Sequence, residues 1–204
     1  MRIRWREFEL PNRVARDEAV SNECYGLFVA EPFERGFGHT IGNGLRRVLL
    51  SSLEGAAVTH VRIQNAQHEF ATIEGVVEDM TEIILNMKKV LVRSSASEPR
   101  TLRLKADAKG PVTAAMIQET SDVEVVNKDL YLCTISKPGV SFEMEVTVRR
   151  GRGFVTAEEN YDPEMELGVI PVDSVFSPVQ RVRYAVQATR VGKMTNYDKL
   201  VLEV

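Results

Sequence analysis

Apolar residues recur at helical spacing in two stretches of the chain. The first stripe consists of Ile41, Leu45, Val48, Leu49 and Leu53, preceded by a candidate N-cap at Thr40. The second consists of Val76, Val77, Met80, Ile83, Ile84, Met87 and Leu91. Acidic residues gather where the second stretch begins and lysines where it ends, which complements a helix dipole. The pattern therefore predicts two helices.

Alternation of apolar and polar residues predicts strands over much of the rest. The expected strands cover 25–33, 56–64, 101–107, 122–127, 130–135, 141–155, 180–192 and 199–204. A turn at Asn65-Ala66 is expected to lead into another extended piece. Residues 111–118 are expected to form a short helical or turn segment, and residues 157–179 an irregular connector. Strands broken by loops and few helices indicate an α+β protein and not alternating βαβ winding.

The stretch 34–55, "ERGFGHTIGNGLRRVLLSSLEG", begins with glycines in the manner of a phosphate-binding loop. Its spacing of Gly36, Gly38 and Gly42 is one residue too long for the dinucleotide fingerprint, and no Lys with Ser or Thr follows the last glycine. Gly42 and Gly44 fall inside the predicted helix, where each costs about 1 kcal/mol relative to alanine. Such glycines indicate a close approach to another part of the structure.

Composition and charge narrow the function classes. The 204 residues are 44% hydrophobic and 27% charged, which suits one large globular domain or two small ones. No apolar run approaches the roughly 20 residues of a membrane span, and the basic amino terminus lacks the apolar core of a signal peptide. We expect a cytoplasmic protein that does not enter a membrane. A net charge of -3 disfavours a domain devoted to gripping phosphates.

One basic stretch remains a local candidate for phosphate contact. The segment 148–154, "VRRGRGF", interleaves Arg149, Arg150 and Arg152 with glycine. It is interpreted either as a solvated strand end and turn or as a phosphate clamp. The first interpretation is favoured, because arginine is common at protein surfaces and often faces water.

Candidate catalytic and metal-binding chemistry is sparse. Cys24 and Cys133 lie far apart, so we expect buried free thiols and neither a disulfide framework nor a zinc knuckle. His60 and His68, with Glu69 nearby, fit no zinc spacing, and G-x-S-x-G does not occur. We expect no active site, cofactor or metal in this chain.

Several segments, taken in order, resemble the amino-terminal domain of the bacterial RNA polymerase alpha subunit. They are "EPFERGFGHTIGNGLRRVLLSSLEGAAVTHVRIQNAQHEFATIEGVVEDMTEIILNMKKV", "GPVTAAMI", "VRRGRGFV" and "FSPVQRVRYAVQATRVGKMTNYDKLVLEV". The resemblance covers nearly the whole chain. It implies an α+β fold with a discontinuous dimerisation domain of sheet plus helices, 1–53 and 175–204, and an inserted, mostly β second domain, 54–174.

The resemblance also implies a function. The family forms a homodimer that serves as a scaffold on which the polymerase subunits β and β′ assemble for transcription. The nucleotidyltransferase site, with the magnesium and zinc of the holoenzyme, belongs to those large subunits. This chain would then be a non-catalytic subunit of a cytoplasmic enzyme.

Particular residues match the family's contact positions. Those implied to dock the large subunits are Arg47, Arg46, Lys88, Arg150 and Arg152. Those implied to aim the first helix are Gly36, Phe37 and Gly38, and those implied to feed the core and the dimer seam are Ile41, Leu45, Leu49 and Leu53.

The family continues after "KLVLEV" with a further helix, a linker and a carboxy-terminal DNA-binding domain. None lies in these 204 residues, which are either the ordered portion of a longer protein or a truncated form. A truncated form should dimerise poorly, and DNA would be contacted only through the complete enzyme or the missing domain. Two alternatives stay open, a nucleic-acid-binding module that uses 148–154 and the arginine pair, and a nucleotide-dependent enzyme built on the glycines.

Overall fold

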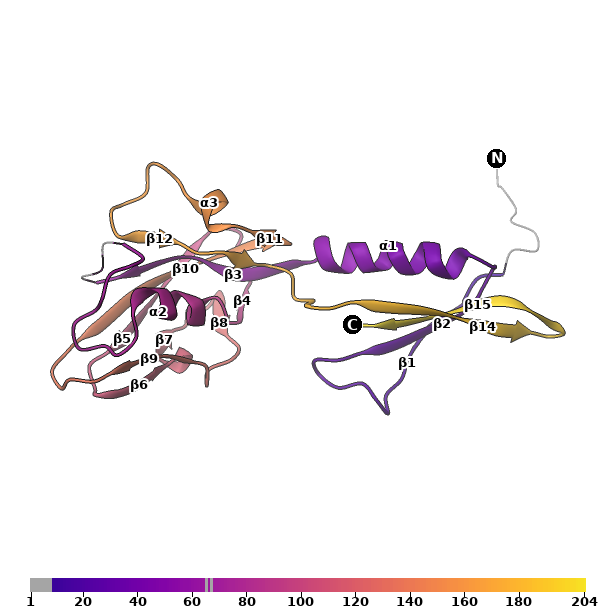
Figure 1. Ribbon diagram of the computed structural model, residues 1–204, viewed down its shortest axis with the longest axis horizontal. Helices are drawn as coiled ribbons and strands as arrows, with labels where there is room; N and C mark the ends of the chain where they lie inside the picture. The colour runs from indigo at the N-terminus through magenta and orange to yellow at the C-terminus, as the bar shows by residue number, and fades with distance from the viewer. Residues whose placement is uncertain (1–8, 65, 67) are drawn as a thin grey trace. The chain divides into compact units, whose positions relative to one another are not determined.

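The computed structural model describes residues 9–64, 66 and 68–204, and the chain divides into two compact units (Figure 1). Unit 1 comprises 1–53 and 179–204, and unit 2 comprises 54–178. Strands predominate over helices in the described residues, and unit 2 is inserted into unit 1. The expected α+β class with an inserted, mostly β second domain is confirmed.

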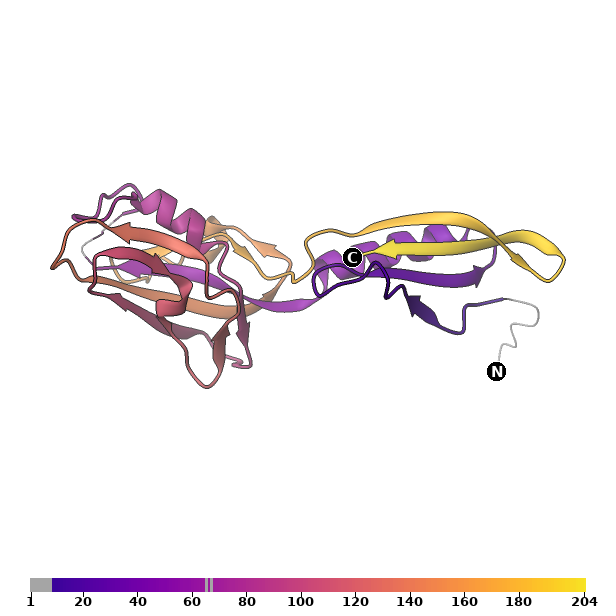
Figure 2. The same ribbon diagram turned by 90° about the horizontal axis from the view of Figure 1, so that it is seen from below.

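Unit 1 is a four-stranded antiparallel sheet with one helix on a face of it (Figures 1 and 2). The strand order is β1 (Val14–Arg16), β2 (Leu27–Phe33), β15 (Met194–Glu203), β14 (Arg183–Val191). Helix α1 (Phe37–Ser51) packs on β14 and β15. Because β2 pairs with β15, the first and last parts of the chain share one sheet.

Helix α1 begins three residues before the predicted N-cap. Gly36 occupies the N-cap position in the left-handed region, with φ 89°, which favours glycine. Thr40 is a residue of the first turn of α1, and its hydroxyl donates to the carbonyl of Gly36 at 3.4 Å. The prediction of Thr40 as N-cap was therefore wrong.

Unit 2 is built around a seven-stranded antiparallel sheet. Its main path runs β7 (Ile117–Gln118), β5 (Arg100–Ala106), β10 (Phe142–Arg152), β3 (Glu54–Ile63), β4 (Val92–Ser94), β8 (Val123–Val125), and β12 (Val169–Pro171) also pairs with β3. Two small sheets join β6 (Gly110–Thr113) to β9 (Tyr131–Ile135) and β11 (Phe154–Val155) to β13 (Ser174–Val175). The helical elements are α2 (Met80–Met87), the 3-10 turn η1 (Ala114–Met116) and α3 (Ala157–Asn160).

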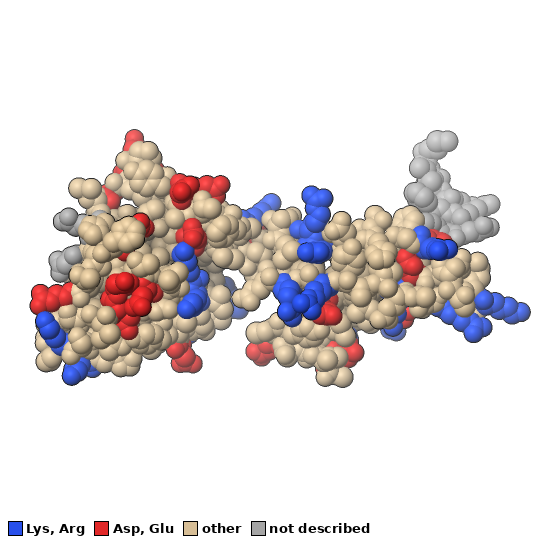
Figure 3. Space-filling model, in the orientation of Figure 1, with Lys and Arg blue, Asp and Glu red and all other residues tan. Residues whose placement is uncertain are grey.

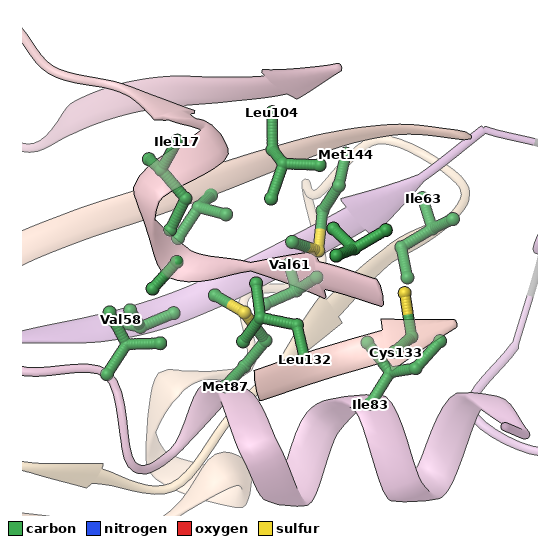
Figure 4. Close-up of a cluster of buried hydrophobic side chains, with 14 of the residues drawn as sticks. Val58, Val61, Ile63, Ile83, Met87, Leu104, Ile117, Leu132, Cys133 and Met144 are labelled. Atoms are coloured by element: carbon green, nitrogen blue, oxygen red, sulfur yellow. The ribbon is translucent and has the colours of Figure 1, made fainter. Parts of the chain in front are cut away.

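The core of unit 2 lies between the large sheet and the layer formed by α2 and β9. Figure 4 shows Ile83 and Met87 pointing from α2 toward Leu132 and Cys133 of β9. Alternate residues of β5 and β10 are buried on one face of the large sheet, because successive side chains of a strand point to opposite faces. Full burial of each Leu, Val, Met or Phe side chain among them stabilises the fold by about 1.5–3 kcal/mol.

Three segments of unit 2 differ from their predicted structure. Helix α2 is shorter than its apolar stripe, because Asp79 caps it by accepting the Glu82 N–H at 2.8 Å, and Val77 and Leu91 are exposed outside it. The extended piece expected after 65–66 is absent from residues 66 and 68–75, and Asn65 itself lies outside the described residues. The connector 157–179 contains α3, β12 and β13 and is thus more regular than expected.

The boundary expected between residues 174 and 175 falls four residues too early. The Phe176 side chain is buried within unit 2, where a Cβ on Gly151 would come within 2.9 Å of its ring and one on Gly55 within 2.0 Å of its carbonyl oxygen. Strand β13 likewise pairs inside unit 2. These contacts keep the chain in unit 2 as far as Pro178.

Candidate subunit interface

The underside of α1 packs on the sheet of unit 1 through two glycines. A Cβ on Gly38 would come within 2.9 Å of Val186, and one on Gly42 within 2.6 Å of Tyr184 and 2.9 Å of Leu200. All three separations are shorter than Cβ atoms normally show, so the helix backbone itself contacts β14 and β15. Gly44 has nothing within 4 Å of its Cβ position, so the close approach expected at Gly44 is absent.

The flank of α1 beside the two glycines carries an apolar row that is exposed in this chain. Ile41 and Val48 are 38% and 53% exposed, with Phe37 and Leu45 between these values. Residues four apart lie on one face of a helix, so Phe37, Ile41 and Leu45 form one strip. Ile41 and Leu45 thus lie outside the buried core of unit 1, whereas Leu49 and Leu53 are half-buried. Their place in a dimer seam stays a prediction.

Arg46 and Arg47 are exposed toward the carboxyl end of α1. Within the described residues, neither guanidinium has a hydrogen bond or an ion pair. Figure 3 shows Lys and Arg side chains gathered over this end of α1. Both arginines are therefore available to a carboxylate or carbonyl of another chain.

Lys88 already has a partner in unit 2. Its Nζ lies 2.7 Å from Oδ2 of Asp173, whose Oδ1 accepts the backbone N–H of Ala157 at 2.7 Å. The Lys88 hydrogen bond, followed by that from Ala157, lowers the pKa of the Asp173 carboxyl. Lys88 thus connects α2 to the segment that precedes β13.

Arg150 and Arg152 converge on one carboxylate. Arg150 Nη2 lies 3.0 Å from Oε2 of Glu54, and Arg152 Nε lies 3.1 Å from Oε1, with the Nη2 group of Arg152 on the same oxygen. Hydrogen bonding and charge from Arg152, then from Arg150, lower the pKa of Glu54. Because the three side chains are exposed, the network contributes little to stability.

The rest of segment 148–154 is a strand end and a turn. Arg149 lies over the ring of Phe176, with its guanidinium carbon 5.9 Å from the ring centroid, and Gly153 turns the chain at φ 64°. The interpretation as a strand end and turn fits this geometry better than a phosphate clamp. Phe154 and Val175 are cross-strand neighbours and both are more than half exposed, which leaves an apolar pair beside the arginines.

The histidines and cysteines provide no metal site among the described residues. His60 contacts the Thr59 hydroxyl at 2.9 Å through Nδ1 and the Asn160 carbonyl at 3.0 Å through Nε2. Cys133 is buried, but Cys24 is exposed, so the expectation of two buried thiols was wrong. No helix in the described part of the chain is long and apolar enough to cross a membrane.

Asp198 is the residue that sequence reasoning missed. Its Oδ2 accepts the backbone N–H groups of Gly36 at 2.7 Å and of Gly38 at 3.3 Å. These residues lie about 160 positions apart, and no local pattern marks the contact. Only a pairing of the chain's two ends could have suggested it.

Comparison with known proteins places this geometry in a family. The model of the RNA polymerase Rpb3/RpoA insert domain matches residues 61–177. The chain belongs to the RNA polymerase Rpb3/RpoA insert domain family. The matched residues of the insert domain all lie in unit 2.

Curated relatives match beyond the insert domain. The chain is 52% identical over 204 residues to the DNA-directed RNA polymerase subunit alpha of Rhodopirellula baltica, which covers 100% of this chain and 61% of the relative. It is 56% identical over 185 residues to the protein of the same name from Symbiobacterium thermophilum, covering 91% and 58% respectively. It is 50% identical over 198 residues to the protein of the same name from Oceanobacillus iheyensis, and the match covers 97% of this chain and 62% of the relative.

The resemblance drawn from the sequence is thereby confirmed. The chain spans about three fifths of the length of these curated relatives. Their similarity includes unit 1, where the exposed row on α1 and the arginine pair lie.

Proposed function

We propose that this chain is the scaffold portion of a bacterial RNA polymerase alpha subunit. In this proposal α1 pairs with α1 of a second copy, and the dimer then docks the large subunits β and β′. The supporting observation is the apolar row of α1, exposed in a chain whose relatives are named as alpha subunits. An apolar strip flanked by charged residues is typical of a protein interaction surface.

The large-subunit contacts are assigned by the same proposal to the basic side chains. Arg47, with Arg46 beside it, would bind β, since both guanidinium groups are exposed. Lys88, Arg150 and Arg152 would contribute through the surfaces they border, because each already bonds to a carboxylate of this chain. The apolar pair Phe154 and Val175 would add buried area to such a contact.

The chain would have no reaction of its own. Catalysis, with its magnesium and zinc, would belong to the large subunits in the cytoplasm, and DNA would be contacted through the complete enzyme. A free nucleic-acid-binding module has less support, because Arg150 and Arg152 are held by Glu54.

Self-association is tested by placing a charge in the apolar row. Leu45→Glu should shift the chain from dimer to monomer in sedimentation equilibrium, because two copies would bury two unpaired carboxylates at the seam. Val77→Glu is the matched control, since Val77 is an exposed apolar residue of unit 2. If Leu45→Glu dimerises as the unmodified chain does, α1 is not the seam.

Docking of β is tested by co-purification. Arg47→Ala should retain less of the β subunit than the unmodified chain, with the dimer unaffected. Arg93→Ala is the control, because Arg93 is also exposed and has only a long 3.5 Å contact with Glu124. Equal retention of β by both variants would exclude Arg47 as the docking residue.

A further inference from the structure

The amino terminus of α1 lacks a cap from its own segment. An α-helix begins with backbone N–H groups that have no intrahelical acceptor. Here the N-cap is Gly36, which has no side chain to accept them, and the first turn contains no acidic residue. The Glu34 carbonyl accepts the Phe37 N–H at 3.0 Å, so what this segment lacks is a side-chain acceptor, which must come from elsewhere in the chain.

Strand β15 supplies it. The carboxylate of Asp198 accepts from Gly36 and from Gly38 through the same oxygen, at 2.7 and 3.3 Å. A negative charge at this end of a helix also complements the helix dipole. One side chain thereby provides both the hydrogen-bond acceptor and the charge that α1 lacks.

Two local features let Asp198 reach the helix. The register of β15 against β2 shifts between Asp198 and Leu200, an irregularity of the kind that redirects side chains along a strand. On the helix side, a Cβ on Gly38 would come within 3.1 Å of both the Asp198 Cβ and Oδ2. A side chain at position 38 would crowd this carboxylate and displace it by a few tenths of an ångström.

We propose that Asp198 is a positioning residue that holds α1 at the angle on the sheet that presents its exposed apolar row to a second copy. The inference rests on the proposed self-association. Ile41 and Leu45 lie one and two turns beyond Gly38, so a change in where α1 begins moves both side chains. Loss of the carboxylate would leave the first turn of α1 less ordered. Dimerisation would then have to order this turn, and the free-energy cost would weaken the dimer.

The test measures α1 and the dimer separately in the 204-residue chain. Amide hydrogen exchange followed by NMR should show that Asp198→Ala loses protection at Gly36 and Gly38, while amides of unit 2 keep theirs. Its dimer dissociation constant should rise about tenfold, the scale of one hydrogen bond to a charged group. Asp198→Asn should lie between, because an amide oxygen still accepts a hydrogen bond without the charge. Glu203→Ala, another carboxylate removed from β15, should change neither measurement.

Unchanged protection and an unchanged dissociation constant in Asp198→Ala would overturn the positioning role and leave self-association intact. If Asp198→Ala is unfolded, Asp198→Asn decides, and a variant equal to the unmodified chain in both measurements overturns the role. A chain that stays monomeric at every concentration is the outcome expected of a truncated form, and protection at Gly36 and Gly38 alone then decides on Asp198.

Discussion

The two units bury their apolar side chains to very different extents. In unit 2 the buried cluster runs from β3 through α2 and β9 to β12. In the described part of unit 1 the buried cluster consists of Ala30, Phe33 and Leu200, with Tyr184 and Val186 partly buried against it. The comparison indicates that unit 2 buries its apolar side chains within itself, whereas unit 1 leaves an apolar strip of α1 exposed.

The two cysteines give the sharpest contrast between the units. Burial, with a smaller contribution from the charge of Glu78, raises the pKa of the Cys133 thiol to about 12. At pH 8 its reactive thiolate is thus on the order of one part in ten thousand, whereas Cys24 of unit 1 is exposed. The folded chain should consume one equivalent of an aromatic disulfide reagent, with the second reacting more than a hundredfold slower. Rapid reaction of Cys24→Ser would contradict the closed core.

Truncation of a leucine in each unit should separate stability from association. Leu104→Ala in unit 2 should lower the free energy of unfolding by about 2–5 kcal/mol, because Leu104 is 1% exposed and its truncation would leave a cavity. Leu45→Ala in unit 1 should lower it by less than about 0.5 kcal/mol in the monomer. Urea unfolding at concentrations below the dimer midpoint measures both. Equal losses would mean that Leu45 is part of a core.

Two glycines of α1 should respond with opposite signs. Gly42→Ala should destabilise unit 1 by about 1–3 kcal/mol, because its methyl group would overlap the ring of Tyr184. Gly44→Ala should stabilise it by about 0.5–1 kcal/mol, because alanine is the better helix former and nothing lies within 4 Å. Thermal unfolding of the two variants checks the signs. The same sign in both would contradict the packing of α1 on β14 and β15.

The smallest expected effect is a pH dependence in unit 2. The pKa of Asp173 is lowered in the folded state, so its stabilising contribution is present above the unfolded pKa and is lost as pH falls through the folded value. Lys88→Met should reduce that dependence below about pH 4, because only the Ala157 N–H then lowers the pKa of Asp173, and it should cost roughly 0.5 kcal/mol or less, since the pair is partly exposed and screened. Acid titrations of both proteins test it. An unchanged acid limb would exclude the Lys88 contact as its cause.

Local patterns predicted the elements whose stability comes from neighbouring residues. The alternation in β5 and β10 and the apolar stripe of α2 indicated the core of unit 2, because periodic burial leaves a periodic sequence. The start of α1 could not be predicted in this way. Its cap is Asp198, so the Thr40 assignment followed a local rule where a distant contact decides.

The candidate interface was predicted in part. The sequence indicated an apolar stripe on α1, and its periodicity could not distinguish a core face from an exposed one. The sequence pattern also does not distinguish Gly42 from Gly44, although of these two only Gly42 contacts the sheet. The roles of Arg47, Lys88, Arg150 and Arg152 toward other subunits stay predictions.

The pairing of β2 with β15 imposes an order on biosynthesis. Strand β2 leaves the ribosome long before β15, and at about 5–20 residues per second the interval is on the order of ten seconds. Unit 2 is completed within that interval, since all of its residues lie between the two strands. The sheet that carries α1 closes only when the last strand is made. A nascent chain would therefore expose α1 without its sheet, and under the proposed self-association a second copy could not bind a finished surface until translation had passed residue 203.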